Sequence, residues 1–323
     1  MHILCKLPTS YLLKFSHSKQ LLIRIAGSTF IYSTYNYQIA TKIISPKYPC
    51  DAAFSIDDKY FAISSTSGDV EVFDTQDFSS IKNLKIKNVQ DCHIAFYDQK
   101  LLISTGHEVL LWSLDNNKLI SLLKNNNSWY LFKENNDKLF CYNSEVPQKE
   151  QVYKMENDVF SPINSFNYAS IDKISFANKH IITYAAYIVK KSNSLLDQYN
   201  EKFVCIHNFI SYLENIDLFQ EDELYAKKNQ LYYRLTVYES DILGSVYSCT
   251  TFISIDMFDV SSNFSYIAVA SHDILFIWDC RKNMCYQKKL ENISYIKFIY
   301  NDDVLAIGTW FHGYIISLKD IMF

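Results

Sequence analysis

Residues 52–74 read AAFSIDDKYFAISSTSGDVEVFD, and this stretch decides the fold. A polar turn at 56–59 and a Ser-Gly turn separate three apolar runs, and Asp74 closes the third run. β-Branched and aromatic residues favour strands, whereas Asp, Ser and Gly favour tight turns. The stretch is therefore predicted to form three antiparallel strands, and the apolar segment 81–86 supplies a fourth.

The same plan recurs at two further places. Residues 94–113 read IAFYDQKLLISTGHEVLLWS, and residues 255–279 read IDMFDVSSNFSYIAVASHDILFIWD. A fourth apolar segment follows each of them, at 119–123 and at 285–290. Four antiparallel strands joined by short turns form the meander of one propeller blade, so each unit is predicted to be a blade.

The residue that ends each third strand gives the period of the repeat. These markers are Tyr32, Phe73, Trp112, Trp278 and Ile316. The first two intervals are 41 and 39 residues, and the last is 38. A fixed period of this length indicates a repeat architecture.

Between Trp112 and Trp278 the repeat is less regular. The gap of 166 residues holds three further units at this period. Their expected markers are Tyr153, a displaced residue near His207 in FVCIHNF, and Tyr238. The polar stretch 190–202 is interpreted as an inserted loop. The count therefore predicts eight blades, and seven is the alternative if 165–250 forms one large blade.

The two ends of the chain are predicted to close the ring. The last unit, 294–318, supplies three strands, and the apolar stretch 1–7 precedes the first strand of the first unit. We expect 1–7 to pair with the last unit as its fourth strand, which leaves no open sheet edge. Residues 1–323 are accordingly interpreted as one propeller domain.

The ends of the third strands also carry a family resemblance. They hold the dipeptides Trp278-Asp279, Phe73-Asp74 and Trp112-Ser113. The pattern resembles the WD-repeat (WD40-like) family, and the resemblance implies an all-β propeller of four-stranded antiparallel blades. The Gly-His dipeptide that the family carries before the first strand is missing there, since Gly106-His107 falls between a second and a third strand. The resemblance indicates no subfamily.

Composition and charge argue against several classes of protein. Hydrophobic residues make up 49% of the 323 residues and charged residues 20%, which is a globular composition. The 31 basic and 35 acidic residues leave a net charge of −4, which argues against direct binding of nucleic acid or of a membrane. No apolar run reaches the roughly 18 residues of a transmembrane helix. Eight dispersed cysteines and the absence of a signal-peptide pattern favour the cytoplasm or nucleus.

The sequence carries no catalytic or ligand-binding signature. The patterns HExxH, GxSxG and GxGxxG are missing, as are the P-loop and the EF-hand loop. The eight histidines form no i,i+3 or i,i+4 pair that would suggest a metal site. We therefore predict no catalytic residue, no cofactor and no metal, and a protein that is not an enzyme.

The expected site is instead a protein-binding face. In a WD-type blade, the loops that enter first strands and those that join second to third strands share one face of the disc. Loops of the first kind carry Tyr11, Asp51, Asp91, Trp129, Asp256 and Tyr295, and loops of the second kind carry His107, His272, Trp310 and His312. Aromatic residues interspersed with acidic residues and histidines favour a protein-binding hot spot over a phosphate site. Trp129 and Trp310 are the strongest candidates for its anchors.

The resemblance implies a non-enzymatic scaffold that binds other proteins in a complex, because WD-type propellers mostly act in this way. A narrower form of this prediction is a non-catalytic subunit of an enzyme that modifies RNA or chromatin. The rival interpretation is a propeller enzyme or small-ligand binder that uses the central channel. That rival predicts polar side chains on the innermost strands, whereas the sequence places apolar ones there, at 52–54 and 94–96.

Overall fold

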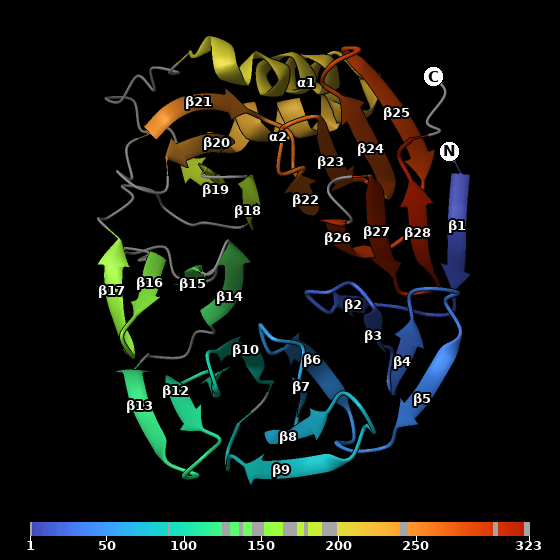
Figure 1. Cartoon of the computed structure of the whole chain (residues 1–323). Helices are drawn as coiled ribbons and strands as arrows, with labels where there is room; N and C mark the ends of the chain where they lie inside the picture. The colour runs from blue at the N-terminus through green and yellow to red at the C-terminus, as the bar shows by residue number, and fades with distance from the viewer. Residues whose placement is uncertain are drawn as a thin grey trace.

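The computed structural model describes residues 2–89, 91–124, 130–135, 138–143, 152–163, 173–177, 180–188, 199–239, 245–299 and 303–319. Within these ranges the strands form seven four-stranded antiparallel sheets, which stand as the blades of a ring (Figure 1). We number the blades 1 to 7 in chain order, beginning with the sheet that follows the N-terminal strand.

Blades 1 to 4 follow one another along the chain. Blade 1 consists of β2 (Leu12–Phe15), β3 (Leu21–Ile25), β4 (Thr29–Ser33) and β5 (Ile39–Ile43). Blade 2 consists of β6 (Pro49–Phe54), β7 (Tyr60–Ser65), β8 (Asp69–Asp74) and β9 (Ser80–Lys85). Blade 3 consists of β10 (His93–Tyr97), β11 (Lys100–Ser104), β12 (Glu108–Ser113) and β13 (Leu119–Lys124). Blade 4 consists of β14 (Tyr130–Asn135), β15 (Lys138–Asn143), β16 (Val152–Glu156) and β17 (Val159–Ile163).

Blades 5 to 7 complete the ring. Blade 5 consists of β18 (Lys173–Ala177), β19 (His180–Ile188), β20 (Leu231–Glu239) and β21 (Ser245–Thr251). Blade 6 consists of β22 (Met257–Val260), β23 (Tyr266–Ser271), β24 (Ile274–Asp279) and β25 (Met284–Lys289). Blade 7 consists of β26 (Ile293–Ile299), β27 (Val304–Thr309) and β28 (Gly313–Ser317), with β1 (His2–Leu7) as its fourth strand. The first strand of each of these sheets lies nearest the ring axis (Figure 1).

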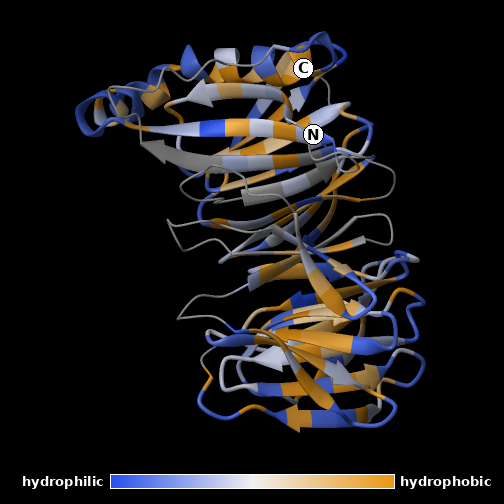
Figure 2. Cartoon of the chain, turned by 90° about the vertical axis from the view of Figure 1, so that its left-hand side faces the viewer, coloured by the Kyte–Doolittle hydropathy of each residue, from blue (hydrophilic) through white to orange (hydrophobic). Residues whose placement is uncertain are grey.

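Buried third-strand residues pack both within and between blades: Phe73 shares an apolar cluster with Ile31 of blade 1, and Trp112 shares one with Val72 of blade 2. Phe73 of β8 stacks on Phe61 of β7, with ring centroids 4.9 Å apart. Trp112 of β12 is fully buried, and its Nε1 donates a hydrogen bond to Asn117 Oδ1 at 2.8 Å. Seen from the side, hydrophobic residues concentrate on the strands and hydrophilic residues on the loops that border them (Figure 2). The blades therefore pack through apolar faces, which do not need the family's full set of polar motif residues.

The described residues form seven blades, the smaller of the two predicted counts. Tyr153 lies on β16 and Tyr238 on β20, so both mark third strands as predicted. The marker near His207 is wrong, because that segment is helical. The apolar residues there are Phe203, Ile206, Phe209, Ile210 and Leu213, whose spacing of three and four residues gives one buried helix face.

The insertion between β19 and β20 takes the place of the expected extra blade. It contains η1 (Glu201–Phe203), α1 (Val204–Glu214), η2 (Asp217–Phe219) and α2 (Gln220–Asn229). The first turn of α2 is acidic and its last turn holds two lysines, which suits the helix dipole at both ends. Of the predicted loop 190–202, residues 190–198 lie outside the described residues, and 201–202 begin η1. No helix among the described residues is long and apolar enough to cross a membrane.

Helix α1 lies between blades 5 and 6 at the rim of the ring (Figure 1). Its buried face contacts Ile182 and Leu235 of blade 5 and Val269 of blade 6 within one apolar cluster. Phe209 stacks on Trp278 of β24, with ring centroids 5.5 Å apart. The helix thus fills the space between two blades with side chains of its own.

The N-terminal strand closes the ring, as predicted. β1 pairs antiparallel with β28, with Leu7 opposite Gly313 and His2 opposite Ser317. The seam, where blade 7 meets the segment between β1 and β2, is also tight at Gly308 of β27. A Cβ on Gly308 would lie 2.3 Å from the carbonyl oxygen of Ser10. Both ends of the described chain therefore take part in one sheet, and the strand that would otherwise be its open edge is covered.

Candidate interaction site

Two of the predicted binding residues lie together at a pocket between blades 6 and 7. The pocket has a volume of about 300 Å³ and is lined by Asp256, Ala270, Asp273, Asn292, Ile293 and Trp310. Four of these residues come from the loops that enter β22 and β26 and from the turns β23–β24 and β27–β28, whereas Ala270 lies on β23 and Ile293 begins β26. The loops are of the two kinds that the sequence assigned to one face. We call this site the Trp310 pocket.

Trp310 stands in the β27–β28 turn on a fixed backbone. Thr309 Oγ1 accepts hydrogen bonds from the backbone N–H groups of Phe311 and His312, at 3.1 and 2.9 Å. The N–H of Trp310 donates to the carbonyl of Asn292 at 3.3 Å, which ties this turn to the entry of β26. The Trp310 side chain is 66% exposed, and Phe311 beside it is 54% exposed. The turn therefore exposes two large aromatic side chains to solvent on a backbone that hydrogen bonds hold in place.

The opposite wall of the pocket is a tight hairpin turn. His272 and Asp273 have φ values of +51° and +59°, which are typical of a type I′ turn between two strands. Asp273 Oδ1 accepts a hydrogen bond from the N–H of Asn292 at 2.8 Å, and the N–H of Leu290 donates to the carbonyl of Asp273 at 2.8 Å. The first bond connects blade 6 with the strand entry of blade 7, and the second lies within blade 6, because Leu290 directly follows β25. Asp256 completes this wall, and its N–H donates to the carbonyl of Ala270 at 2.9 Å.

The predicted partner residue His272 is engaged within the chain. Its Nε2 lies 3.0 Å from Asp222 Oδ2 on α2, and its ring meets that of Phe219 edge-on at 5.6 Å. Asp222 Oδ2 also accepts a hydrogen bond from the N–H of Ser254 at 3.2 Å. His272 thus positions the start of α2 beside the Trp310 pocket.

Asp51 was predicted at the surface, but the structure buries it between blades. Its carboxylate accepts hydrogen bonds from the N–H of Ala52 at 2.8 Å and from the N–H of Ile94 on blade 3 at 3.1 Å. Lys14 Nζ of blade 1 lies 3.3 Å away and His93 Nδ1 lies 3.6 Å away. Burial raises the pKa of Asp51, but Lys14 and His93 outweigh burial and bring the pKa down to about 2. The sequence places Asp51 at a strand entry, and it does not show that a neighbouring blade covers this position.

Asp259 makes a similar bridge that the sequence analysis missed. Its carboxylate accepts hydrogen bonds from Ser175 Oγ of blade 5 at 2.6 Å and from the N–H of Phe298 of blade 7 at 2.8 Å. Lys297 Nζ lies 3.8 Å away. The sequence does contain a signal for this bridge, because Asp259 is a carboxylate between apolar residues on an inner strand. Asp51 and Asp259 therefore each connect their own blade with the two neighbouring blades.

The basic groups that line the central channel are paired with carboxylates. A cavity of about 240 Å³ is lined by Lys14, Phe15, His17, Ala52, Ala53, Phe54, Ile94, Ala95, Phe132, Tyr295, Lys297 and Ile299. The apolar residues predicted at 52–54 and 94–95 are thus confirmed as lining, whereas the basic residues were not predicted. Lys14 faces Asp51 and Lys297 faces Asp259. Tyr295, predicted on the protein-binding loop face of the disc, lines this channel instead, and burial together with Asp259 and Asp51 raises the pKa of its phenol.

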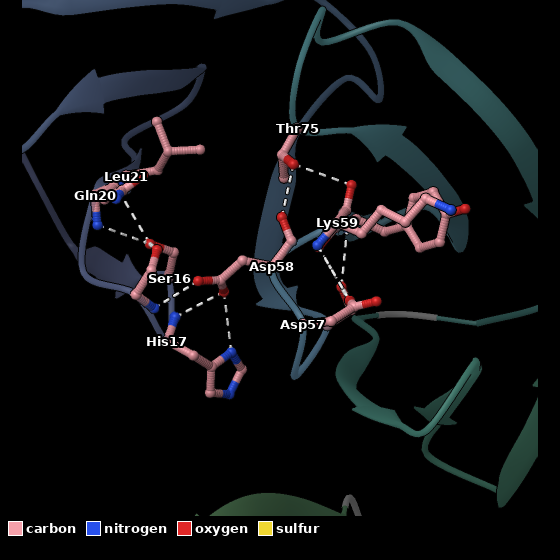
Figure 3. A network of polar contacts seen from close by, with 11 residues as sticks. Ser16, His17, Gln20, Leu21, Asp57, Asp58, Lys59 and Thr75 are labelled. Carbon is pink, nitrogen blue, oxygen red and sulfur yellow. Dashed lines mark hydrogen bonds and ion pairs between the residues drawn. The ribbon is translucent and has the colours of Figure 1, made fainter.

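His17, the third basic residue of the channel, belongs to a network that joins blades 1 and 2 (Figure 3). The Asp58 carboxylate accepts from the N–H groups of His17 and Ser18, at 2.7 and 2.5 Å, and lies 3.1 Å from His17 Nδ1. Burial raises the pKa of Asp58, but these hydrogen bonds outweigh burial and lower it. Asp58 lies in the turn between β6 and β7, and its contacts here are structural.

The remaining predicted residues are not brought to the Trp310 pocket. Tyr11 donates its hydroxyl to the carbonyl of Pro49 at 2.6 Å and so packs against blade 2. Asp91 and His107 are exposed. His312 is half-buried, with its ring edge-on to Tyr314. Trp129 lies outside the described residues. No group of three or more His, Cys, Asp or Glu residues suited to a metal ion is found in the part of the chain that the structure describes.

Comparison with known proteins gives the fold. No protein-family model and no curated protein sequence matches the chain. The RRP9 WD40 repeats superpose with a TM-score of 0.61 at 13% identity, covering 96% of this chain and 94% of that one. The Cps50 (Swd1) β-propeller domain of Myceliophteria thermophila superposes with a TM-score of 0.67 at 12% identity, covering 98% and 99%. Kuenenia stuttgartiensis hydrazine synthase superposes with a TM-score of 0.67 at 9% identity, covering 98% and 97%. The chain therefore has the WD40-like β-propeller fold, and that fold also occurs in an enzyme.

Proposed function

We propose that the protein is a non-enzymatic scaffold that binds a partner protein at the Trp310 pocket. The observation that carries the proposal is the exposed indole of Trp310, held on a fixed turn beside a pocket of about 300 Å³. Tryptophan is enriched at binding hot spots, and it contributes most where a pocket lies next to it. Rigid presentation also reduces the entropy that is lost on binding.

The charges at the pocket favour a positively charged partner side chain. Asp256 and Asp273 line it, and no lysine or arginine is among its lining residues. An indole face also attracts a guanidinium or ammonium group through its quadrupole. A partner segment that combines one Arg or Lys with an apolar residue for Phe311 would match this surface. The helical insertion beside the pocket exposes Leu224 and Tyr225 and extends the surface that a partner can cover.

The proposal leaves the complex open. A non-catalytic subunit of an enzyme that modifies RNA or chromatin, in the cytoplasm or nucleus, would use such a pocket in the same way. The rival function in the central channel is less well supported, since Lys14 and Lys297 already face the buried carboxylates of Asp51 and Asp259.

Affinity purification of the tagged full chain from its native cell, with quantitative mass spectrometry, tests the proposal. Trp310→Ala is compared with Tyr35→Ala, which removes an aromatic side chain that is 96% exposed in the β4–β5 turn, a turn of the opposite kind. We expect a stoichiometric partner protein that binds Tyr35→Ala as tightly as wild type. Trp310→Ala should bind this partner with roughly 30-fold lower affinity, a loss of about 2 kcal/mol of binding free energy. A partner that both variants retain equally would contradict the site, and the absence of any partner would contradict the scaffold.

A further inference from the structure

Asn292 connects the turn that carries the Asp273 carboxylate with the turn that carries the Trp310 indole. Its backbone N–H donates a hydrogen bond to Asp273 Oδ1 at 2.8 Å, and its carbonyl accepts one from the N–H of Trp310 at 3.3 Å. Asn292 has a φ of +53°, a conformation that asparagine adopts more readily than most residues. One residue therefore holds the acidic turn of blade 6 beside the aromatic turn of blade 7.

The Asp273 carboxylate can accept a further hydrogen bond from a partner. Its Oδ1 accepts from the N–H of Asn292, and a carboxylate accepts hydrogen bonds at both of its oxygens. The histidine beside it, His272, faces Asp222 at 3.0 Å instead. Asp256 adds a second carboxylate, and no lysine or arginine is among the residues that line the pocket. The pocket therefore places negative charge beside the exposed indole of Trp310.

The size of the pocket suits one side chain of a partner. Its volume of about 300 Å³ lies at the lower end of the roughly 300–1,000 Å³ that small-molecule sites span. A guanidinium is planar and carries five N–H donors in a fixed fork, so its face can stack on an indole while its edge donates to a carboxylate. An ammonium is a compact and strongly hydrated charge, and it cannot divide a face and an edge between two such groups.

We infer that the Trp310 pocket selects arginine over lysine in the partner segment, with the guanidinium stacked on Trp310 and hydrogen-bonded to Asp273. The inference rests on the proposed function, because it names the side chain that the same pocket takes from the partner. Asp273 determines the preference, since its carboxylate is the acceptor for the edge of the guanidinium. The indole alone attracts either cation.

Two matched peptides test this preference on the full-length folded chain. They are acetyl-Leu-Arg-Leu-amide and acetyl-Leu-Lys-Leu-amide, which differ only in the cationic side chain. The readout is the NMR signal of the Trp310 indole N–H; the chain has four tryptophans, and Trp310→Phe identifies the signal by removing it. We expect the arginine peptide to shift this signal with a Kd roughly tenfold lower than that of the lysine peptide, because it makes an additional charge-assisted hydrogen bond.

Asp273→Asn removes the charge and keeps the turn. Asparagine suits the φ of +59° at this position, and its Oδ1 can still accept from the N–H of Asn292. This variant should bind the arginine peptide roughly tenfold more weakly and should lose the preference over lysine. The matched control is Asp77→Asn, which changes an exposed carboxylate in the turn between β8 and β9 and should bind both peptides as wild type does.

Three results would overturn the inference: equal affinities for the two peptides, a preference that Asp273→Asn retains, or a Trp310 signal that neither peptide shifts at roughly 10 mM. The capture of a partner tests the scaffold separately. A partner captured through Trp310 together with equal peptide affinities would leave the scaffold standing and overturn the arginine preference. An arginine preference without any captured partner would support the preference of the pocket and contradict the scaffold.

Discussion

Replacing Asp51 by Asn tests whether inter-blade carboxylates hold the ring together. Asp51 is 7% exposed, and its carboxylate joins blades 1, 2 and 3 through Lys14 and the N–H of Ile94. Its pKa falls from the usual 3.8 to about 2. Each pKa unit is worth about 1.36 kcal/mol, so the charged form contributes about 2.5 kcal/mol to folding. Asp51→Asn should lower the free energy of unfolding at pH 7 by roughly that amount.

The sign of the pH dependence follows from the direction of the shift. A depressed pKa means that the stabilisation is complete above the unfolded-state value of 3.8 and is lost as the pH falls towards about 2. Wild type should therefore lose about 2.5 kcal/mol relative to Asp51→Asn between about pH 5 and pH 1, as the pH falls through the folded-state pKa. Guanidinium denaturation at a series of pH values, followed by tryptophan fluorescence, measures both quantities.

The matched control is Asp77→Asn. Asp77 is fully exposed in the turn between β8 and β9, and Asn can keep its turn hydrogen bond to the N–H of Ser79. This variant should unfold at the wild-type denaturant concentration. If Asp51→Asn also unfolds there, with the pH slope of wild type, the carboxylate bridge does not stabilise the ring and the reasoning is refuted.

Three further predictions concern the packing of the ring. Phe209→Ala should cost about 3–5 kcal/mol in the free energy of unfolding, because the side chain is fully buried between blades 5 and 6; a loss below about 1 kcal/mol in denaturant titration would mean that α1 does not pack there. Gly308→Ala should cost about 1–3 kcal/mol, because its Cβ would meet the Ser10 carbonyl oxygen at 2.3 Å; an unchanged melting temperature would contradict the tight seam. Deletion of residues 2–7 should expose the edge of β28 and cause self-association that light scattering detects; a monomer as stable as wild type would show that the closing strand is dispensable.

The fold was predictable where sequence and structure share one period. The markers Tyr32, Phe73 and Trp112 recur at intervals of 41 and 39 residues, and Trp278 and Ile316 lie 38 residues apart; each is buried on a third strand. The prediction failed at FVCIHNF, where an apolar run of strand length was interpreted as a strand. The continuation to Leu213 shows helical spacing, and a longer window would have revealed it.

The site was predictable only in part, because a loop position does not fix the burial of its side chain. Asp256 and Trp310 do meet at one pocket, since loops that enter first strands and turns that join second to third strands lie on one face. Asp51 and Tyr295 occupy equivalent loop entries, yet a neighbouring blade covers Asp51 and the channel receives Tyr295. Such burial depends on how two blades meet, and the sequence of one blade does not contain that information.

Site-specific photo-crosslinking tests most directly the central claim that a partner protein binds at the Trp310 pocket. A benzophenone amino acid replaces Phe311, beside the pocket, in one variant and Tyr35, in a turn of the opposite kind, in the other, and both are irradiated in the native cell. The account predicts a defined crosslinked product from position 311, with the attachment mapped to a partner segment that contains Arg or Lys, and no such product from position 35. Equal crosslinking from both positions, or products from position 35 alone, would contradict it.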